Sequence, residues 1–387
     1  MTKPNQGPLS GMKVIEFAGL GPAPFGVMQL ADMGAEVLRI DRPGGYPSPA
    51  PGLSFEALGD RALFNRGRRT VRVNMKSPEG LALVKSLLGQ ADVLVEGFRP
   101  GTMEKLGLGP DVCHALNPRL IYGRMTGWGQ TGPMAHMAGH DMNYIGLSGA
   151  LSLFPYAGEG GIPPLVGDMP GGLYLVMGIL AAYIHAKATG EGQVVDAAIA
   201  DGAANLYALL STLRMSGFHN APAGGNLLDG GAHFYRTYKC ADGESLIVGA
   251  IEPQFRKILL ENLGLLGDEK FTSGRVEDDA YCTTVLRDLF LTQPRDHWVA
   301  LFDGTDGCVT PVLSPEDAVE HPHNKARGTF QPIDGGMQQA PTPRFSATPA
   351  GVGENAGRAM QPDAQALQSW GCGDREIQAL LASGVIE

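Results

Sequence analysis

The chain has 387 residues, which suggests two to three domains of ordinary size, and 43% of them are hydrophobic, enough for real cores. Its formal net charge of −10 argues against a general binder of nucleic acid or of anionic membranes, so an anionic ligand would need a local basic pocket. The five cysteines lie far apart without a CxxC pair, which argues against a disulfide framework and against a zinc ribbon.

The N-terminal half alternates short apolar runs with helical patterns. Buried strands are predicted at residues 13–17, 36–40, 70–73, 93–96, 120–124 and 194–199. Helices are predicted at residues 25–33, 77–88, 173–189 and 200–215. Strands that alternate with helices in this way predict an α/β fold with a parallel, Rossmann-like sheet.

The turn after the first strand matches only part of the dinucleotide-binding fingerprint. Gly19 and Gly21 provide its first two glycines, but Pro24 stands where the third should be. This departure makes a nicotinamide-dependent dehydrogenase a distant alternative.

Arginines follow two of the predicted strands. Arg39 and Arg42 lie at and just after the end of the second strand, and Arg99 follows the strand at 93–96. Loops past the carboxyl ends of parallel strands form the ligand crevice, and arginine is the favoured partner for phosphate. We expect these side chains to converge on one anionic ligand; the alternative is that they are scattered charges that serve solubility.

The C-terminal part changes character after residue 215. Residues 216–224 read as a linker, and 225–325 as a small α+β domain that contains a hairpin with Asp242-Gly243 at its turn. Residues 326–362, rich in Pro and Gly, read as a second linker and an extended return. Residues 330–387 are therefore expected to rejoin residues 1–215 as a discontinuous large domain.

Two proton carriers stand out between residues 138 and 172. His140 and Asp168 each lie next to a glycine in loop-like sequence, and the apolar run that follows Asp168 predicts a helix beginning at that carboxylate. Each residue also has a structural alternative. The histidine could be a hydrogen-bonded structural group, and the aspartate a simple N-cap.

The sequence also gives expectations about metal and location. His321 and His323 are too isolated to suggest a metal site. Residues 1–6 lack the apolar core of a signal peptide, and the most apolar stretch, 173–186, is short for a bilayer span. Because scattered cysteines are typical of a reducing compartment, we expect a cytoplasmic protein with neither membrane nor nucleic acid as a partner.

Several motifs together resemble a known family. They are PLSGMKVIE (8–16), GAEVLRIDRP (34–43), EGFRPG (96–101), RMTGWGQTGP (124–133), AGHD (138–141), DGG (229–231) and GAIEPQF (249–255). In this order and spacing the chain resembles the class III CoA-transferase superfamily and, within it, the alpha-methylacyl-CoA racemases. The resemblance implies a Rossmann-like large domain, a smaller α+β domain, and an interlocked homodimer of two rings threaded through each other.

The resemblance also implies a chemistry. In the racemase branch a His–Asp pair, here His140 and Asp168, moves the α-proton of a 2-methylacyl-CoA and so interconverts its (R) and (S) forms through an enolate. In the transferase branch an aspartate at the position of Asp168 attacks the acyl-CoA, and CoA passes to a free carboxylate. Simple transferases usually lack the histidine, so His140 favours the racemase. Glu252 matches the residue that supports the histidine from the small domain.

The remaining site residues would bind the acyl-CoA substrate. Arg39, Arg42, Arg99 and Lys105 would hold its phosphates, and Asp141 and Tyr144 would contact it beside His140. A backbone N–H near Asp141 is the candidate donor to the enolate oxygen. Neither metal nor organic cofactor is expected, because the thioester itself acidifies the α-carbon. A non-catalytic CoA-binding protein, with His140 and Asp168 structural, is the remaining alternative.

Overall fold

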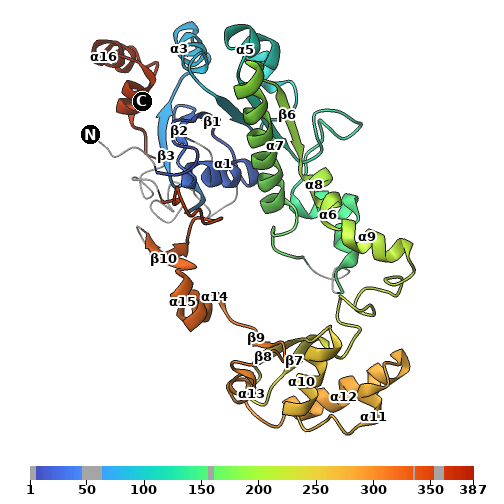
Figure 1. Ribbon diagram of the computed structural model, residues 1–387. Coiled ribbons are helices and arrows are strands. Elements are labelled where there is room, and N and C mark those ends of the chain that lie inside the picture. Colours follow the sequence, from blue (N-terminus) through green and yellow to red (C-terminus); the bar gives the residue numbers. More distant parts are fainter. Residues whose placement is uncertain (1–5, 46–62, 156–160, 334–335, 353–360) are drawn as a thin grey trace. The chain divides into compact units, whose positions relative to one another are not determined.

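The computed structural model in Figure 1 describes residues 6–45, 63–155, 161–333, 336–352 and 361–387. Two predictions fall partly outside these residues. The prediction about a signal peptide rests mostly on residues 1–5, and the predicted second linker includes residues 353–360. The chain forms two compact units. Unit 1 comprises Met1–Ser148, Ile162–Asn205 and Pro322–Glu387, and unit 2 comprises Gly149–Gly161 and Leu206–His321.

This division differs from the predicted domains 1–215 with 330–387 and 225–325. Residues 149–161 and 206–215 group with unit 2. The helix predicted at 200–215 is interrupted at Tyr207, whose hydroxyl lies close to Gly149, and Pro155 lies close to Gly224. Packing of these short segments against one another, rather than a shift in composition, therefore places the boundary.

Unit 1 is built on a six-stranded sheet in the order β3-β2-β1-β4-β5-β6. The strands are β1 (Lys13–Phe17), β2 (Glu36–Asp41), β3 (Arg68–Arg72), β4 (Val93–Glu96), β5 (Ile121–Thr126) and β6 (Val194–Ala198). All neighbouring strands pair in parallel, which confirms the predicted Rossmann-like sheet. The strand order reverses between β1 and β4, and the crevice outside their carboxyl ends is where such sheets bind ligands.

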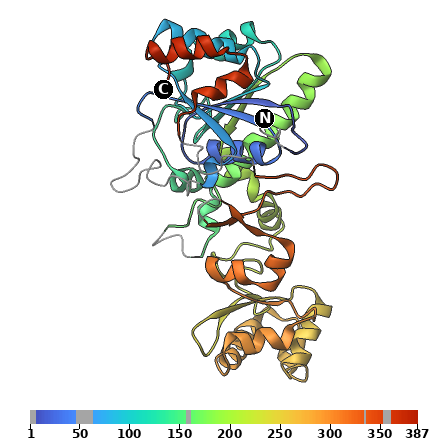
Figure 2. The same ribbon diagram turned by 90° about the vertical axis from the view of Figure 1, so that its left-hand side faces the viewer.

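Helices cover both faces of the sheet (Figures 1 and 2). α1 (Pro22–Asp32) and α7 (Asp168–Thr189) share one hydrophobic core with the sheet, and α3 (Pro78–Leu88), α5 (Pro110–Leu116), η6 (Ala364–Trp370) and α16 (Asp374–Ala382) share the other. Adjacent strand residues serve opposite faces, as Val14 packs on the α1 side and Ile15 on the α3 side. Both faces of the inner strands β1 and β4 are buried, so most of their side chains are apolar, and the charged Glu16 of β1 is ion-paired with Arg68.

The C-terminal return is more structured than the sequence suggested. It contains α15 (Pro322–Arg327) and an antiparallel pair of strands, β10 (Phe330–Ile333) and β11 (Gly336–Gln339). Two arginines near the start of β3 fix it to the sheet. Arg66, two residues before the strand, pairs with Asp32 and donates to the Gln339 carbonyl at 2.9 Å, and Arg69, within the strand, lies 2.8 Å from Asp363. These arginines therefore have a structural role.

Further elements of unit 1 are η2 (Leu63–Asn65), α4 (Thr102–Lys105), α6 (Asp141–Ser148) and α8 (Ile199–Leu206). Unit 2 contains η3 (Ala150–Leu153), α9 (Ala208–Met215), β7 (Tyr235–Lys239), β8 (Ser245–Gly249), α10 (Pro253–Asn262), α11 (Glu269–Thr272), η4 (Val276–Asp278), α12 (Asp279–Phe290), α13 (Arg295–Phe302), β9 (Val309–Pro311) and α14 (Pro315–Glu320). β7 and β8 form the predicted hairpin, and β9 completes an antiparallel sheet of three strands.

α7 is longer than the apolar stretch that predicted it. It has 22 residues, and its most apolar window has a mean hydropathy of 1.4, so by length and composition alone it could cross a membrane. Its inner face packs against α1, β5 and β6, as the core helix of a water-soluble protein does. The helix is therefore weak evidence for a membrane span.

Candidate active site

The amino ends of α1 and α7 meet because the two helices touch through glycines. A Cβ atom on Gly172 would lie 2.5 Å from the Pro22 carbonyl oxygen, and one on Gly26 would lie 2.8 Å from the Gly172 carbonyl oxygen. Any larger residue would force the helices apart. Their close approach brings the first residue of α7, Asp168, beside the turn that follows β1 at the reversal point of the sheet.

Asp168 faces Gly21 in that turn. Gly21 has φ 69, a left-handed conformation that favours glycine, and a Cβ atom there would lie 3.0 Å from Asp168 Oδ2. Gly167, not Asp168, occupies the N-cap position of α7, and the cap involves no side-chain hydrogen bond. The alternative in which Asp168 is a simple N-cap is therefore wrong.

His140 immediately precedes α6, a helix that the sequence did not predict. Its backbone N–H donates to Asn143 Oδ1 at 3.0 Å, and the Asn143 N–H donates to the His140 carbonyl at 2.8 Å. The first of these bonds is half of a capping box, with asparagine at the third helical position, whereas the second goes to a backbone carbonyl and not to a side chain. The His140 side chain is exposed. Asn143, which sequence reasoning missed, thus fixes the backbone that carries the histidine.

Asp141 connects the two helix starts. Its Oδ1 accepts a hydrogen bond of 2.7 Å from the Asp168 backbone N–H, although Asp141 is the first residue of α6 and Asp168 the first of α7. The contact needs Gly167, because a Cβ atom there would lie 2.3 Å from Asp141 Oδ1. The structure therefore brings together His140, Asp141 and Asp168 within unit 1.

Tyr144 supports the same segment from one turn further along α6. Its hydroxyl donates to the Gly139 carbonyl, and its ring packs edge-on against Trp128 with centroids 4.7 Å apart. The phenol is buried, and its hydrogen bond holds the chain before His140. Burial and the Asp168 charge raise the pKa of Tyr144, while the Arg99 charge opposes that shift.

The surroundings of Asp168 favour its protonated form. Burial has the largest effect, the nearby Asp141 charge adds to it, and His140 acts in the opposite direction; together they raise the pKa of Asp168 to about 6. A carboxyl group with this pKa populates both protonation states near neutral pH, as an acid–base catalyst requires.

The raised pKa of Asp168 predicts a gain of stability when the charge is removed. The folded protein holds this proton up to about pH 6 and the unfolded chain only to about pH 4, so the contribution of Asp168 to stability falls as pH rises between them. Asp168→Asn should therefore raise the free energy of unfolding by on the order of 1–3 kcal/mol at about pH 7.5, with the gain vanishing toward about pH 4. Urea denaturation at both pH values measures it; an equal effect at both would contradict the prediction.

The predicted phosphate-binding residues have different environments. Arg42, Arg99 and Lys105 are exposed, and the Arg42 Nε donates to the Gly45 carbonyl at 2.9 Å. Arg39 is only 1% exposed, with its guanidinium group 3.5 Å from the Asp41 carboxylate. The accessible cations are the better candidates for a phosphate, whereas buried Arg39 pairs with Asp41 within the sheet.

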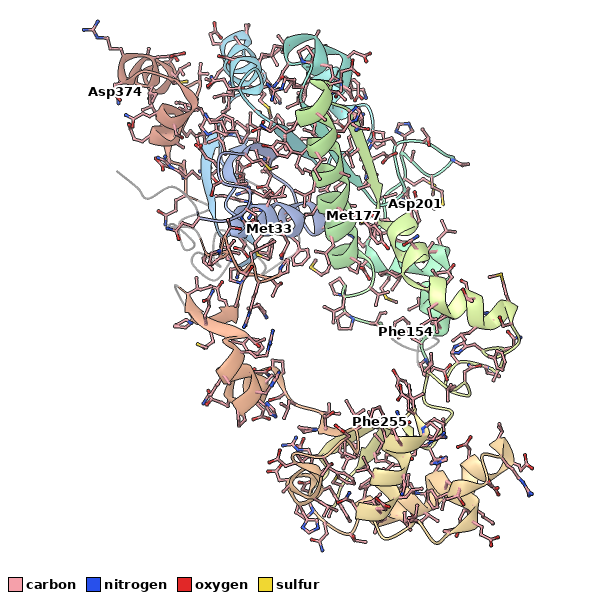
Figure 3. All side chains as sticks on the ribbon, in the orientation of Figure 1. Met33, Phe154, Met177, Asp201, Phe255 and Asp374 are labelled. Atoms are coloured by element: carbon pink, nitrogen blue, oxygen red, sulfur yellow. The ribbon has the colours of Figure 1, made fainter. Side chains whose placement is uncertain are left out.

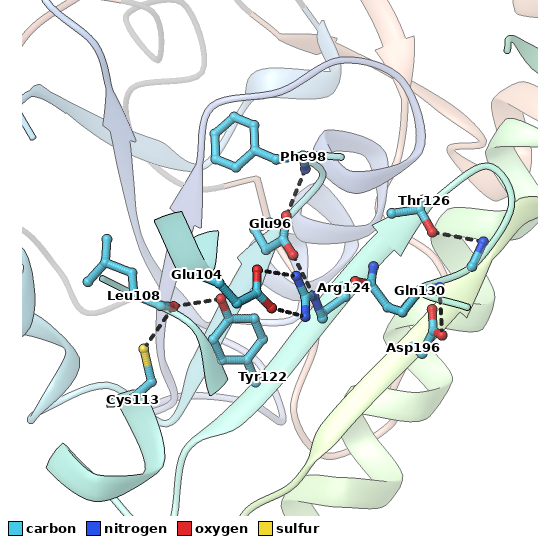
Figure 4. A network of polar contacts seen from close by, with 11 residues as sticks. Glu96, Phe98, Glu104, Leu108, Cys113, Tyr122, Arg124, Thr126, Gln130 and Asp196 are labelled. Atoms are coloured by element: carbon cyan, nitrogen blue, oxygen red, sulfur yellow. Dashed lines mark hydrogen bonds and ion pairs between the residues drawn. The ribbon is translucent and has the colours of Figure 1, made fainter. Parts of the chain in front are cut away.

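An ion-pair network supports the loop that carries Arg99 (Figure 4). Arg124 Nε donates to Glu96 at 2.8 Å and its Nη1 donates to Glu104 at 2.8 Å. The other oxygen of Glu96 accepts the Phe98 N–H at 2.7 Å, one residue before Arg99. The network therefore fixes this loop at the carboxyl end of β4, beside the reversal point.

Glu252 lies in unit 2, at the N-cap position of α10. Its side chain is exposed and makes no cap hydrogen bond with that helix. Glu252 therefore stands at the start of this helix without capping it through its side chain.

Within the described ranges, no group of three or more His, Cys, Asp or Glu side chains is placed to hold a metal ion. The described cysteines Cys113, Cys240, Cys282, Cys308 and Cys372 are all free thiols.

Comparisons with known proteins agree with this architecture. The chain is 43% identical over 346 residues to the alpha-methylacyl-CoA racemase of Homo sapiens, covering 88% of this chain and 87% of that protein. It is 36% identical over 282 residues to the succinate–glutarate CoA-transferase of Agrobacterium fabrum, covering 68% of each. A crystal structure of a CAIB/BAIF family protein from Brucella suis matches with a TM-score of 0.75 and 29% identity, over 90% of this chain and 96% of that one. The model of CoA-transferase family III matches residues 9–362, and the chain therefore belongs to this family.

Proposed function

We propose that this protein is a racemase that interconverts (R)- and (S)-2-methylacyl-CoA thioesters by transfer of the α-proton through an enolate. The observation that carries the proposal is the pair of proton carriers His140 and Asp168 at adjacent helix starts, with the Asp168 pKa raised to about 6. The similarity to a racemase over most of the chain supports it.

The two carriers provide one base and one acid in each direction. One removes the α-proton, the C–H electron pair forms the enolate double bond, and the thioester oxygen takes the negative charge. The other, protonated, returns a proton to the opposite face, so the pair finishes with its protonation states exchanged. Neutral His140 with protonated Asp168 is one state; imidazolium with carboxylate is the other. Groups of this kind contribute about 10² to 10⁴-fold each.

The start of α6 is the proposed donor to the enolate oxygen. The first N–H groups of a helix have no acceptor within that helix. The His140 N–H is used by Asn143, so the Asp141 N–H is the next donor along the chain. Preorganised donors at a developing oxyanion usually contribute the largest single effect.

The rest of the acyl-CoA would be held around this centre. Exposed Arg42, Arg99 and Lys105 are proposed to bind its phosphates, and Glu252 to hydrogen-bond His140 and fix its tautomer in the assembled site. We propose no cofactor beyond the CoA of the substrate, because the thioester itself acidifies the α-carbon. The free thiols support a reducing, cytoplasmic location.

The alternative is transfer of CoA from an acyl-CoA to a free carboxylate through an Asp168 acyl anhydride, which the similarity to a CoA-transferase favours. One epimer of a 2-methylacyl-CoA, incubated with the protein in D₂O, separates the two. Deuterium at the α-carbon together with epimerisation supports the racemase. Absence of exchange, with CoA passing to an added carboxylic acid, would replace it by the transferase.

An exposed apolar stripe on α7 supports the proposed homodimer. Leu173, Met177 and Ile184 are 50%, 59% and 70% exposed, and Met177 is labelled in Figure 3. Their helical spacing places them on one side of the helix, and contiguous apolar surface of this kind marks interaction sites.

Charging this stripe should prevent the subunits from assembling. The double variant Met177→Glu with Ile184→Glu is expected to change the mass in light scattering from twice 40.8 kDa to 40.8 kDa, because burying two carboxylates in an interface is strongly unfavourable. His185→Glu, an exposed position on the same helix, is the matched control and should leave the mass unchanged. A wild-type protein of 40.8 kDa would overturn the homodimer itself.

A further inference from the structure

Asp141 has a side chain that the proposed chemistry does not yet use. It is 8% exposed, its Oδ1 accepts the Asp168 backbone N–H at 2.7 Å, and its Oδ2 has no hydrogen-bond partner among the described residues. A buried carboxylate oxygen without a donor is destabilising, and such groups are concentrated where function requires them.

The observed hydrogen bond does not require a negative charge. An asparagine of the same shape would accept the same N–H through its amide oxygen, without burying an ion. The hydrogen bond to the Asp168 N–H therefore accounts for an acceptor at position 141, but it does not account for the negative charge of Asp141. The charge acts on Asp168, and the titratable groups that interact with Asp168 are Asp141, His140 and Tyr144. The Gly21 turn also approaches the Asp168 carboxyl group.

We infer that Asp141 is a positioning residue for Asp168: its hydrogen bond fixes the start of α7, and its buried carboxylate places a negative charge beside the Asp168 carboxyl group. The inference rests on the proposed function, in which Asp168 must act both as acid and as base. It assigns the two effects to different properties of one side chain, so two substitutions separate them.

Asp141→Asn keeps the hydrogen bond and removes the charge. The carboxyl group of Asp168, labelled with ¹³C and identified by its absence in Asp168→Asn, should then titrate about one pH unit lower than in the wild type, because a like charge nearby raises a carboxyl pKa. The acidic limb of the pH profile for α-proton exchange should move by the same amount. Asp201→Asn removes an equal charge from the exposed first turn of α8 and should leave the titration unchanged.

Asp141→Ala removes both the charge and the bond. Its kcat for exchange should be about tenfold or more below that of Asp141→Asn, because a small displacement of a catalytic group is costly, whereas KM should change less. If Asp141→Asn titrates like the wild type, the charge has no such role. If the alanine and asparagine variants have equal kcat, the hydrogen bond does not position Asp168.

The NMR titration also distinguishes this inference from the proposed function. It reports the Asp168 carboxyl group in the intact protein whatever reaction is catalysed. A wild type that exchanges no α-proton would remove the racemase proposal, while a shifted titration in Asp141→Asn would still support the link between Asp141 and Asp168. If the alanine variant does not fold, the isosteric asparagine variant alone decides on the charge.

Discussion

His140→Gln and Asp168→Asn are each expected to lower the rate of racemisation by about 10² to 10⁴-fold, because each removes one of the two groups that must carry a proton. Both substitutions preserve side-chain size and some hydrogen-bonding capacity. The measurement is loss of optical purity of a 2-methylacyl-CoA, starting from each epimer in turn.

Isotope exchange gives the sharper result. With two bases on opposite faces, each single variant keeps one base, so it should still exchange the α-proton of one epimer with D₂O while failing to convert it to the other. The two variants should retain opposite epimers. If each variant loses exchange of both epimers to the same extent, His140 and Asp168 do not act on opposite faces of the α-carbon.

Each residue has a matched control of the same residue type. His136→Gln changes an exposed histidine four positions before His140, and Asp201→Asn changes an exposed aspartate labelled in Figure 3. Both should racemise at the wild-type rate. If CoA binding persists in all variants and no wild-type activity is found, the non-catalytic alternative for this chain is favoured.

The inner strands β1 and β4 could be predicted from sequence because they are buried on both faces. Such strands read as continuous apolar runs, and β1 and β4 begin and end at the predicted residues. The hairpin of β7 and β8 could also be predicted, because Asp242-Gly243 is typical of a hairpin turn. The α1 start was displaced by several residues, since Pro22 and Pro24 look like a turn but occupy the first turn of the helix, where proline is tolerated.

The site residues were found by motif, but their arrangement was not. Nothing local indicates that Asp141 reaches the Asp168 backbone, or that Gly26 and Gly172 allow α1 and α7 to touch, because these are contacts between distant segments. α6 was missed because Gly139 and Gly146 weaken a short helical pattern that only capping by Asn143 and packing of Tyr144 complete. For Arg39, the sequence showed a cation at a strand end, whereas burial beside Asp41 became visible only in the fold.

The buried pair of Glu16 and Arg68 is expected to show the largest effect on stability. Both side chains are 0% exposed and ion-paired, and Arg68 also donates to the carbonyl groups of Pro24 and Phe64. Arg68→Met leaves the Glu16 carboxylate buried without its partner, so it should lower the free energy of unfolding by about 3–5 kcal/mol. Urea denaturation at one fixed protein concentration measures this.

The control is Arg69→Met, which breaks the neighbouring pair with Asp363. Those two side chains are 35% and 41% exposed, so the loss should stay below about 1 kcal/mol. The double variant Glu16→Leu with Arg68→Met should lose less than the sum of its single variants, since it buries no unpaired charge. Because Pro24 lies in the first turn of α1, close to the Gly21 turn that faces Asp168, Arg68→Met should also reduce kcat, whereas Arg69→Met should not. Equal losses of stability in the two single variants would show that burial of the Arg68 pair does not determine its importance.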